Sequence, residues 1–210
     1  MKGVIFDFWG TLVENGTYSP MKQTFSMLRV RIPFSQFVEK FERIFMTKSF
    51  PSKADAFKEV CREFDIPVKE FIIDNLVGLW NKNVFLASLY DDTVESLKQL
   101  REKGVKIALV SNCPDNNVEP VLEKFALSEF FDVILLSHKE GLLKTDKEFY
   151  DRVLENLDLE KDEVIVVGDS YMSDIKGAEK AGIKAIMIDR KDKRDYENKI
   201  KSLLELTEVQ

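Results

Sequence analysis

Short runs of apolar, often β-branched residues alternate with amphipathic stretches over the C-terminal half of the chain. The runs predict buried strands at residues 105–110, 132–136, 164–167 and 184–188. The stretches that follow them predict helices at residues 114–125, 147–157, 175–182 and 196–206. Residues 4–8 predict a further strand and residues 91–103 a further helix. Because strands and helices alternate, the pattern predicts an α/β fold, a doubly wound parallel sheet with helices on both faces.

The alternation stops between the first strand and residue 86. This segment has no strand pattern, and eight of its phenylalanines fall at mostly helical intervals: Phe25, Phe34, Phe37, Phe41, Phe45, Phe57, Phe64 and Phe71. The spacing of Phe37, Phe41 and Phe45 places them on one helix face, which favours the core of a small helical bundle over a ligand pocket. We therefore predict a core domain of residues 1–16 and 88–210, interrupted by an all-helical domain of residues 17–87.

Composition narrows the class of protein. The 210 residues are 44% hydrophobic, which is enough for a packed core, and the net charge of −6 gives no electrostatic reason to expect nucleic acid or an anionic membrane as partner. The apolar run at the N-terminus is too short for a signal peptide, and no later run is long enough to span a bilayer. We expect a cytoplasmic protein with a small-molecule substrate; the sequence leaves its oligomeric state open. Cys61 and Cys113 are expected to be reduced, with a disulfide as the less favoured alternative.

Polar residues follow four of the predicted strands. They are Asp7, the pair Ser111 and Asn112, Lys144, and the pair Asp169 and Asp174. In doubly wound sheets the ligand binds at the carboxyl ends of the strands, so we expect these side chains to converge there. Three carboxylates that converge without a cation would repel one another. Oxygen ligands of this kind suit Mg²⁺, which proteins often share with a substrate phosphate.

Each of these residues also has an ordinary structural explanation. Asp7 could form a turn or cap a helix, Ser111 could cap the helix after residue 113, and Lys144 alone is typical of a solvated surface. The one histidine, His138, also follows a strand, but no partner pattern surrounds it and we expect a structural or exposed role. What these explanations leave unaccounted for is four polar signals at four strand ends in one chain.

The same residues resemble the motifs of the haloacid dehalogenase superfamily of hydrolases. The matching pieces are DFWGTL, SN, the lysine of GLLKTD, and GDSYMSD, which occur in the family's order over about two thirds of the chain. The helical insert occupies the position of the family's cap domain. The resemblance implies a Rossmann-like core in which Asp7 is the nucleophile and forms an aspartyl intermediate.

The resemblance also implies the remaining roles. Mg²⁺ would be held by the Asp7 carboxylate, the Trp9 backbone carbonyl and Asp169, with Asp174 binding directly or through water. Ser111 and Asn112 would bind the phosphoryl group, and Lys144 would neutralise Asp7 and the developing phosphoryl charge.

Trp9 departs from the family's phosphatases, which usually carry a second Asp at this position to protonate the leaving group. Indole cannot supply that proton, and the family's dehalogenases have an aromatic residue here. A 2-haloacid dehalogenase that binds its substrate through Arg29 or Arg31 is therefore an alternative, as is a phospho-ligand-binding protein with weak turnover. We favour a Mg²⁺-dependent phosphatase, because a dehalogenase needs no metal and Asp169 and Asp174 would be superfluous in it.

A missing general acid typically slows the chemistry by about 10²–10⁴-fold. We therefore expect aryl and acyl phosphates to be cleaved far better than alkyl phosphates. Equal rates for the two kinds of substrate would mean that another residue, for example one from the cap, supplies the proton.

Overall fold

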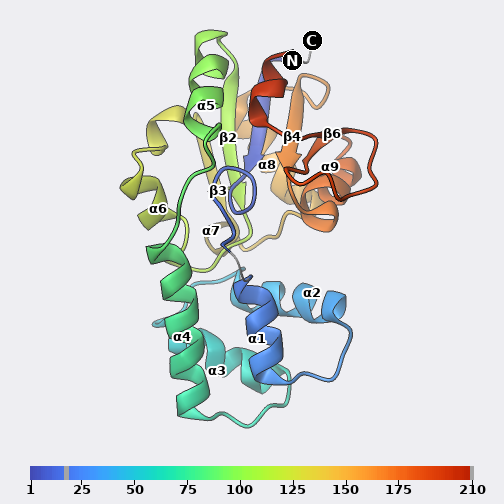
Figure 1. Ribbon diagram of the computed structural model, residues 1–210. Helices are drawn as coiled ribbons and strands as arrows, with labels where there is room; N and C mark the ends of the chain where they lie inside the picture. Colours follow the sequence, from blue (N-terminus) through green and yellow to red (C-terminus); the bar gives the residue numbers. More distant parts are fainter. Residues whose placement is uncertain (17–18, 209–210) are drawn as a thin grey trace.

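The computed structural model describes residues 1–16 and 19–208 and contains one parallel sheet with an inserted group of helices (Figure 1). The strands lie in the order β3-β2-β1-β4-β5-β6. Their bounds are β1 (Gly3–Asp7), β2 (Lys106–Ser111), β3 (Val133–Leu136), β4 (Val164–Gly168), β5 (Lys184–Ile188) and β6 (Lys199–Ile200). The chain moves outward from β1 to β3 on one side and then returns to β4 on the other. The point where strand order reverses therefore lies between β1 and β4.

Helices connect the strands. Those of the sheet domain are α5 (Thr93–Glu102), α6 (Glu119–Lys124), α7 (Ser137–Glu140), α8 (Lys147–Leu157) and α9 (Lys176–Ala181). The inserted ones are α1 (Pro20–Leu28), α2 (Phe34–Phe45), α3 (Lys53–Glu63) and α4 (Glu70–Phe85). Two short 3₁₀ segments, η1 (Ser128–Phe130) and η3 (Leu203–Glu208), and one π-helical turn, η2 (Tyr171–Ile175), complete the described elements.

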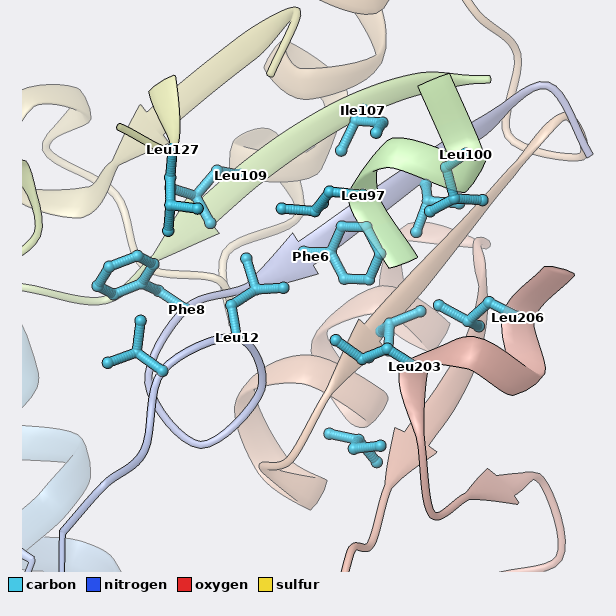
Figure 2. Packing of buried hydrophobic residues seen from close by; sticks show 14 of the residues in the cluster. Phe6, Phe8, Leu12, Leu97, Leu100, Ile107, Leu109, Leu127, Leu203 and Leu206 are labelled. Carbon is cyan, nitrogen blue, oxygen red and sulfur yellow. The ribbon is translucent and has the colours of Figure 1, made fainter. Parts of the chain in front are cut away.

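The sheet is buried on both faces, because side chains of successive strand residues point to opposite sides. Phe6 of β1 packs on one face, where Figure 2 shows it surrounded by leucines of α5 and η3. Ile5 packs on the other face with residues of α8 and α9 such as Phe149 and Ala178. This arrangement confirms the predicted α/β class and the doubly wound parallel sheet.

The inserted helices, residues 20–85, have a hydrophobic cluster of their own, and we call them the cap. Phe37, Phe41 and Phe45 are fully buried in it, which confirms their prediction as core. The ring of Phe45 lies 4.6 Å from that of Phe57 and 5.0 Å from that of Trp80, centroid to centroid. The exact division of the chain into two domains stays a prediction; residue 17, at the first predicted boundary, lies outside the described residues.

The two connections between core and cap run side by side. Val13 of the outgoing connection forms an antiparallel bridge with Leu89 of the returning one. Two backbone hydrogen bonds flank the bridge: Glu14 N donates to Ser88 O at 2.9 Å, and Tyr90 N donates to Leu12 O at 3.2 Å. The cap is thus attached through a short paired ribbon. In Figure 1 the strand arrows point toward it.

The prediction of a helix at residues 196–206 is wrong. Residues 199–200 form β6 beside β5, where Met187 N donates to Asn198 O and Asp189 N donates to Ile200 O at 2.8 Å. Without this pairing the backbone groups of β5 along that edge would lack partners, and satisfying them outweighs a weak local helix pattern. The helix predicted at residues 114–125 is also shorter, since α6 begins only at Glu119.

Two smaller expectations can be compared with the structure. Cys61 and Cys113 are both buried and both free, as expected. Among the described residues there is no helix with the length and hydrophobicity that a bilayer crossing requires.

The cap cluster generates a stability prediction. Phe41→Ala should lower the free energy of unfolding by about 3–5 kcal/mol, because it leaves a cavity among the buried rings. Phe71 lies in the same group of helices but is 64% exposed, so Phe71→Ala should change this free energy by no more than about 0.5 kcal/mol. Denaturant unfolding followed by tryptophan fluorescence measures both. Equal, small effects of the two substitutions would contradict the packing described here.

Candidate active site

Asp7 is the last residue of β1, at the carboxyl edge of the sheet beside the point where strand order reverses. It is paired with Val110 of β2, so Ser111 lies one position further along the neighbouring strand. On the other side β4 ends at Gly168, and Asp169 follows directly. Three of the predicted site residues therefore come together because three adjacent parallel strands end at the same level.

The Lys144 ammonium joins two buried carboxylates. Its Nζ donates to Asp7 Oδ1 and to Asp174 Oδ1, the latter at 2.5 Å, and the Lys144 side chain is only 3% exposed. Burial alone would lower the pKa of Lys144, but Asp174 and Asp7 outweigh it and raise this pKa well above its ordinary value. The lysine is thus held as a cation. The second oxygen of Asp7 accepts a hydrogen bond from Thr11 Oγ1 at 3.1 Å.

Asp174 is carried by the π-helical turn η2. Its Oδ2 accepts a hydrogen bond from Ser170 N at 2.8 Å, and its side chain is fully buried. A Cβ on Gly168 would lie 2.2 Å from Asp174 Oδ2, so only glycine lets β4 run this close to the carboxylate. A single π turn in a helix is often found at functional sites, and here it turns Asp174 back toward the strand ends.

Asp7, Asp169 and Asp174 form an acidic cluster. One carboxylate oxygen from each lies within 4.8 Å of those of the other two. Burial raises the pKa of Asp7, although Lys144 opposes the shift, and burial together with the charges of Asp7 and Asp174 raises that of Asp169. Lys144 pairs with Asp7 and Asp174, while Asp169 lies 3.7 Å from the partly exposed guanidinium of Arg194. Carboxylate oxygens are hard ligands that suit Mg²⁺, and the charge of this ion would balance the excess negative charge of the cluster.

The backbone after Trp9 closes one side of this cluster. Gly10 has φ +88°, and a Cβ there would lie 2.6 Å from the Asp169 carboxylate. Glycine therefore permits both the left-handed turn and the close approach. The Trp9–Gly10 peptide consequently lies beside Asp169, where a backbone carbonyl can add to the oxygen ligands.

The Trp9 side chain has a structural contact of its own. Its Nε1–H donates to Asn117 Oδ1 at 2.7 Å, and its ring meets that of Phe8 edge to face at 5.4 Å. The indole therefore ties the turn after β1 to the loop after β2. Neither its chemistry nor its hydrogen bond makes it a proton donor to a ligand.

Ser111 and Asn112 lie at the end of β2, as predicted. The Ser111 side chain is buried at the carboxyl edge. Asn112 makes two side-chain contacts: its Oδ1 accepts from Lys144 N at 3.0 Å, and its Nδ2 donates to Glu42 Oε2 at 2.9 Å. The Asn112 side chain thus links the Lys144 loop to the cap, a contact that no sequence motif indicates.

Glu42 is the polar side chain that the cap helix α2 brings to this site. It follows Phe41, whose ring is in the cap cluster, so it lies on a different side of α2. Burial raises the pKa of the Glu42 carboxyl to about 7, while the hydrogen bond from Asn112 and the charge of Lys144 oppose the shift. The residue was not predicted from sequence, because one glutamate among many in an amphipathic helix has no distinguishing pattern.

Further contacts hold this part of the cap against the core. Arg43 forms a two-pronged ion pair with Asp146, at 2.6 Å and 2.8 Å, and Asp146 lies two residues after Lys144. Ser137 Oγ donates to Met46 O at 2.5 Å. Asp115 accepts from Ser49 Oγ at 3.0 Å. The cap residues in these contacts follow Glu42 along the chain, and they hold the end of α2 and the turn after it against the core.

Comparison with known proteins agrees with this geometry. The sequence profile of the haloacid dehalogenase-like hydrolases matches residues 4–188. The chain belongs to this family. It is therefore a hydrolase, and the motifs that suggested the resemblance lie together at the carboxyl edge of its sheet.

Individual relatives match all or part of the chain. A glyceraldehyde 3-phosphate phosphatase of Methanocaldococcus jannaschii is 24% identical over 100% of this chain and 96% of its own length. A ribulose-1,5-bisphosphate 5-phosphatase of Halopiger xanaduensis is 30% identical, but over 55% of this chain and 48% of its own, so the match spans about half of that relative. A phosphatase of the family from Thermococcus onnurineus has the same fold, with a TM-score of 0.66, 24% identity and coverage of 100% and 97%.

A 2-haloacid dehalogenase of Pseudomonas syringae has the same fold too, with a TM-score of 0.68 and 17% identity over 100% of this chain and 97% of that one. The fold is thus shared by phosphatases and dehalogenases and does not decide between them. The side chains are more informative. Arg29 and Arg31, the residues proposed to hold a haloacid, are both exposed at and beyond the end of α1.

Proposed function

We propose that this hydrolase is a Mg²⁺-dependent phosphatase that acts on a small phosphorylated metabolite through an aspartyl-phosphate intermediate. The observation that carries the proposal is the acidic cluster of three carboxylates, two of which are paired with the buried ammonium of Lys144. The third, Asp169, has only the partly exposed guanidinium of Arg194 at 3.7 Å. A dehalogenase needs the nucleophile and the lysine but has no use for the additional carboxylates. The names of the two phosphatase relatives support a phosphorylated metabolite as substrate.

The first half of the reaction begins at Asp7. One carboxylate oxygen of Asp7 attacks phosphorus, the bond from phosphorus to the ester oxygen breaks, and the alcohol leaves after taking up a proton. Lys144 holds Asp7 in position and places a fixed positive charge beside the transferring group, and the Ser111 hydroxyl donates to a phosphoryl oxygen. In the second half water attacks phosphorus, which releases inorganic phosphate and restores the Asp7 carboxylate.

Asp7, Asp169 and the backbone carbonyl of Trp9 would hold Mg²⁺, with Asp174 binding directly or through water. The bound ion would supply positive charge for the phosphoryl oxygens during transfer. Asn112, whose side chain contacts Lys144 and Glu42, positions the loop that carries Ser111. No other cofactor is required. A small molecule is the proposed partner, and neither nucleic acid nor membrane enters the proposal.

Metal binding gives a direct test. Mg²⁺ should bind the wild-type protein in calorimetry and raise its unfolding temperature, because it binds the folded state and not the unfolded one. Asp169→Asn removes one ligand charge and should weaken binding and abolish the rise. Asp74→Asn, an exposed carboxylate on cap helix α4, is the matched control and should behave as the wild type. A wild-type protein that binds no Mg²⁺ and dehalogenates 2-chloropropionate in the presence of a chelator would overturn the proposal.

Substitutions of the nucleophile and the lysine give a second test. Asp7→Asn should abolish turnover of aryl phosphates, since an amide is neither a competent nucleophile nor an anionic ligand. Lys144→Ala should lower kcat by about 10²–10³-fold, the usual effect of removing one stabilising charge or donor. It should also destabilise the fold by about 3–5 kcal/mol, because it leaves two buried carboxylates without their partner.

The lysine variant is therefore assayed at a temperature where circular dichroism shows it folded. Lys147→Ala removes a nearby lysine whose ion pair with Asp151 is largely solvated, and it should leave kcat unchanged. Near-normal turnover in Asp7→Asn would contradict the covalent mechanism.

A further inference from the structure

The leaving group of an alkyl phosphate needs a proton, and the turn after Asp7 does not supply one. Trp9 occupies the position from which the family's phosphatases usually donate it. The indole N–H is instead used in the hydrogen bond to Asn117. A phosphatase with this site needs another acid, close to Asp7 but outside the metal cluster.

Glu42 is placed for this role by the closed arrangement of cap and core. Its Oε2 is held by Asn112, the residue directly after Ser111, and Asn112 is bonded in turn to Lys144 N. Glu42 is therefore linked to both the phosphate-binding loop and the loop of the catalytic lysine. Within the described part of the chain its other oxygen, Oε1, takes part in no hydrogen bond.

The neighbours of Glu42 favour the acid form. Burial is the largest influence and raises the pKa of Glu42 to about 7, and the negative charges of Asp174 and Asp7 act in the same direction. The hydrogen bond from Asn112 and the charge of Lys144 oppose the shift. A carboxyl group that is partly protonated near neutral pH is suited to general acid catalysis. Glu42 forms no salt bridge with a lysine or arginine that would hold it permanently ionised among the described residues.

We propose that Glu42 is the general acid that replaces the missing aspartate at position 9. The role rests on the proposed phosphatase function. As the bond from Asp7 to phosphorus forms and the bond from phosphorus to the ester oxygen breaks, the proton of Glu42 moves to the departing oxygen and gives a neutral alcohol. In the second half the Glu42 carboxylate accepts a proton from the attacking water. The bond from Asp7 to phosphorus breaks, and inorganic phosphate and protonated Glu42 result.

Two kinds of ester separate proton donation from other roles. With Mg²⁺ present, Glu42→Gln should lower kcat for glycerol 2-phosphate, an alkyl ester, by about 10²–10⁴-fold. The first-turnover burst of nitrophenolate from 4-nitrophenyl phosphate should be nearly unchanged, because that leaving group departs without a proton. Glutamine keeps an oxygen that can accept from Asn112, so the variant should retain the cap contact. Glu42→Asp, a shorter acid, should recover part of the alkyl activity.

Glu39→Gln is the matched control. It makes the same change on an exposed position of the same helix and should alter neither rate. An equal loss of the alkyl rate and the burst in Glu42→Gln would make Glu42 a positioning residue and overturn the proposal. Loss confined to an amino-bearing ester such as phosphoethanolamine would instead show that Glu42 recognises a cation, and would overturn it as well. A wild-type protein that cleaves neither ester overturns the proposed function itself, and the role of Glu42 with it.

Discussion

The ammonium of Lys144 is the contact on which the rest of the site depends. It is buried between Asp7 at the end of β1 and Asp174 in the π turn after β4, and it comes from a loop that follows β3. Burying an amine is unfavourable unless its hydrogen bonds and charge are satisfied, and burying two carboxylates together is equally so. The three groups are stable here only as a set, so the three segments are fixed relative to one another. The backbone also packs closely here. A Cβ on Gly177 would lie 2.4 Å from the carbonyl oxygen of Lys144, so this position requires glycine.

Lys144 does not balance the whole cluster, because Asp169 adds a third carboxylate whose ion pair is with the partly exposed Arg194, at 3.7 Å. The pKa values of Asp169 and Asp7 are raised, which means that the ionised forms of these carboxyl groups are less stable here than in water. The folded protein thus keeps an excess of negative charge at the strand ends, which a divalent cation would neutralise. Polar networks that are unfavourable without their ligand are common at functional sites. The fold is shared by phosphatases and dehalogenases, so the proposal of phosphoryl chemistry rests on this excess of carboxylates.

Much of the core could be predicted from sequence, because its signals are local. Runs such as Val164–Gly168 are apolar and β-branched, and buried parallel strands require that composition. The residues at their ends, Asp7 and Asp169, could be expected to meet because the strands are parallel and adjacent. Residues 199–200 were assigned to a helix because their strand pairing depends on the exposed edge of β5, a tertiary effect. Glu42 could not be found, since its contact with Asn112 joins positions 70 residues apart in different parts of the fold.

The paired ribbon that joins core and cap has a mechanical consequence. A single connecting segment would let the cap both bend and rotate about the connection. Two segments paired through Val13 and Leu89 bend together and resist twisting. Movement of the cap should therefore be close to a rotation about one hinge axis. Each time the cap closes, α2 returns to the strand ends in the same orientation. The open position of the cap would then admit substrate, and the closed position of the same movement would complete the active site.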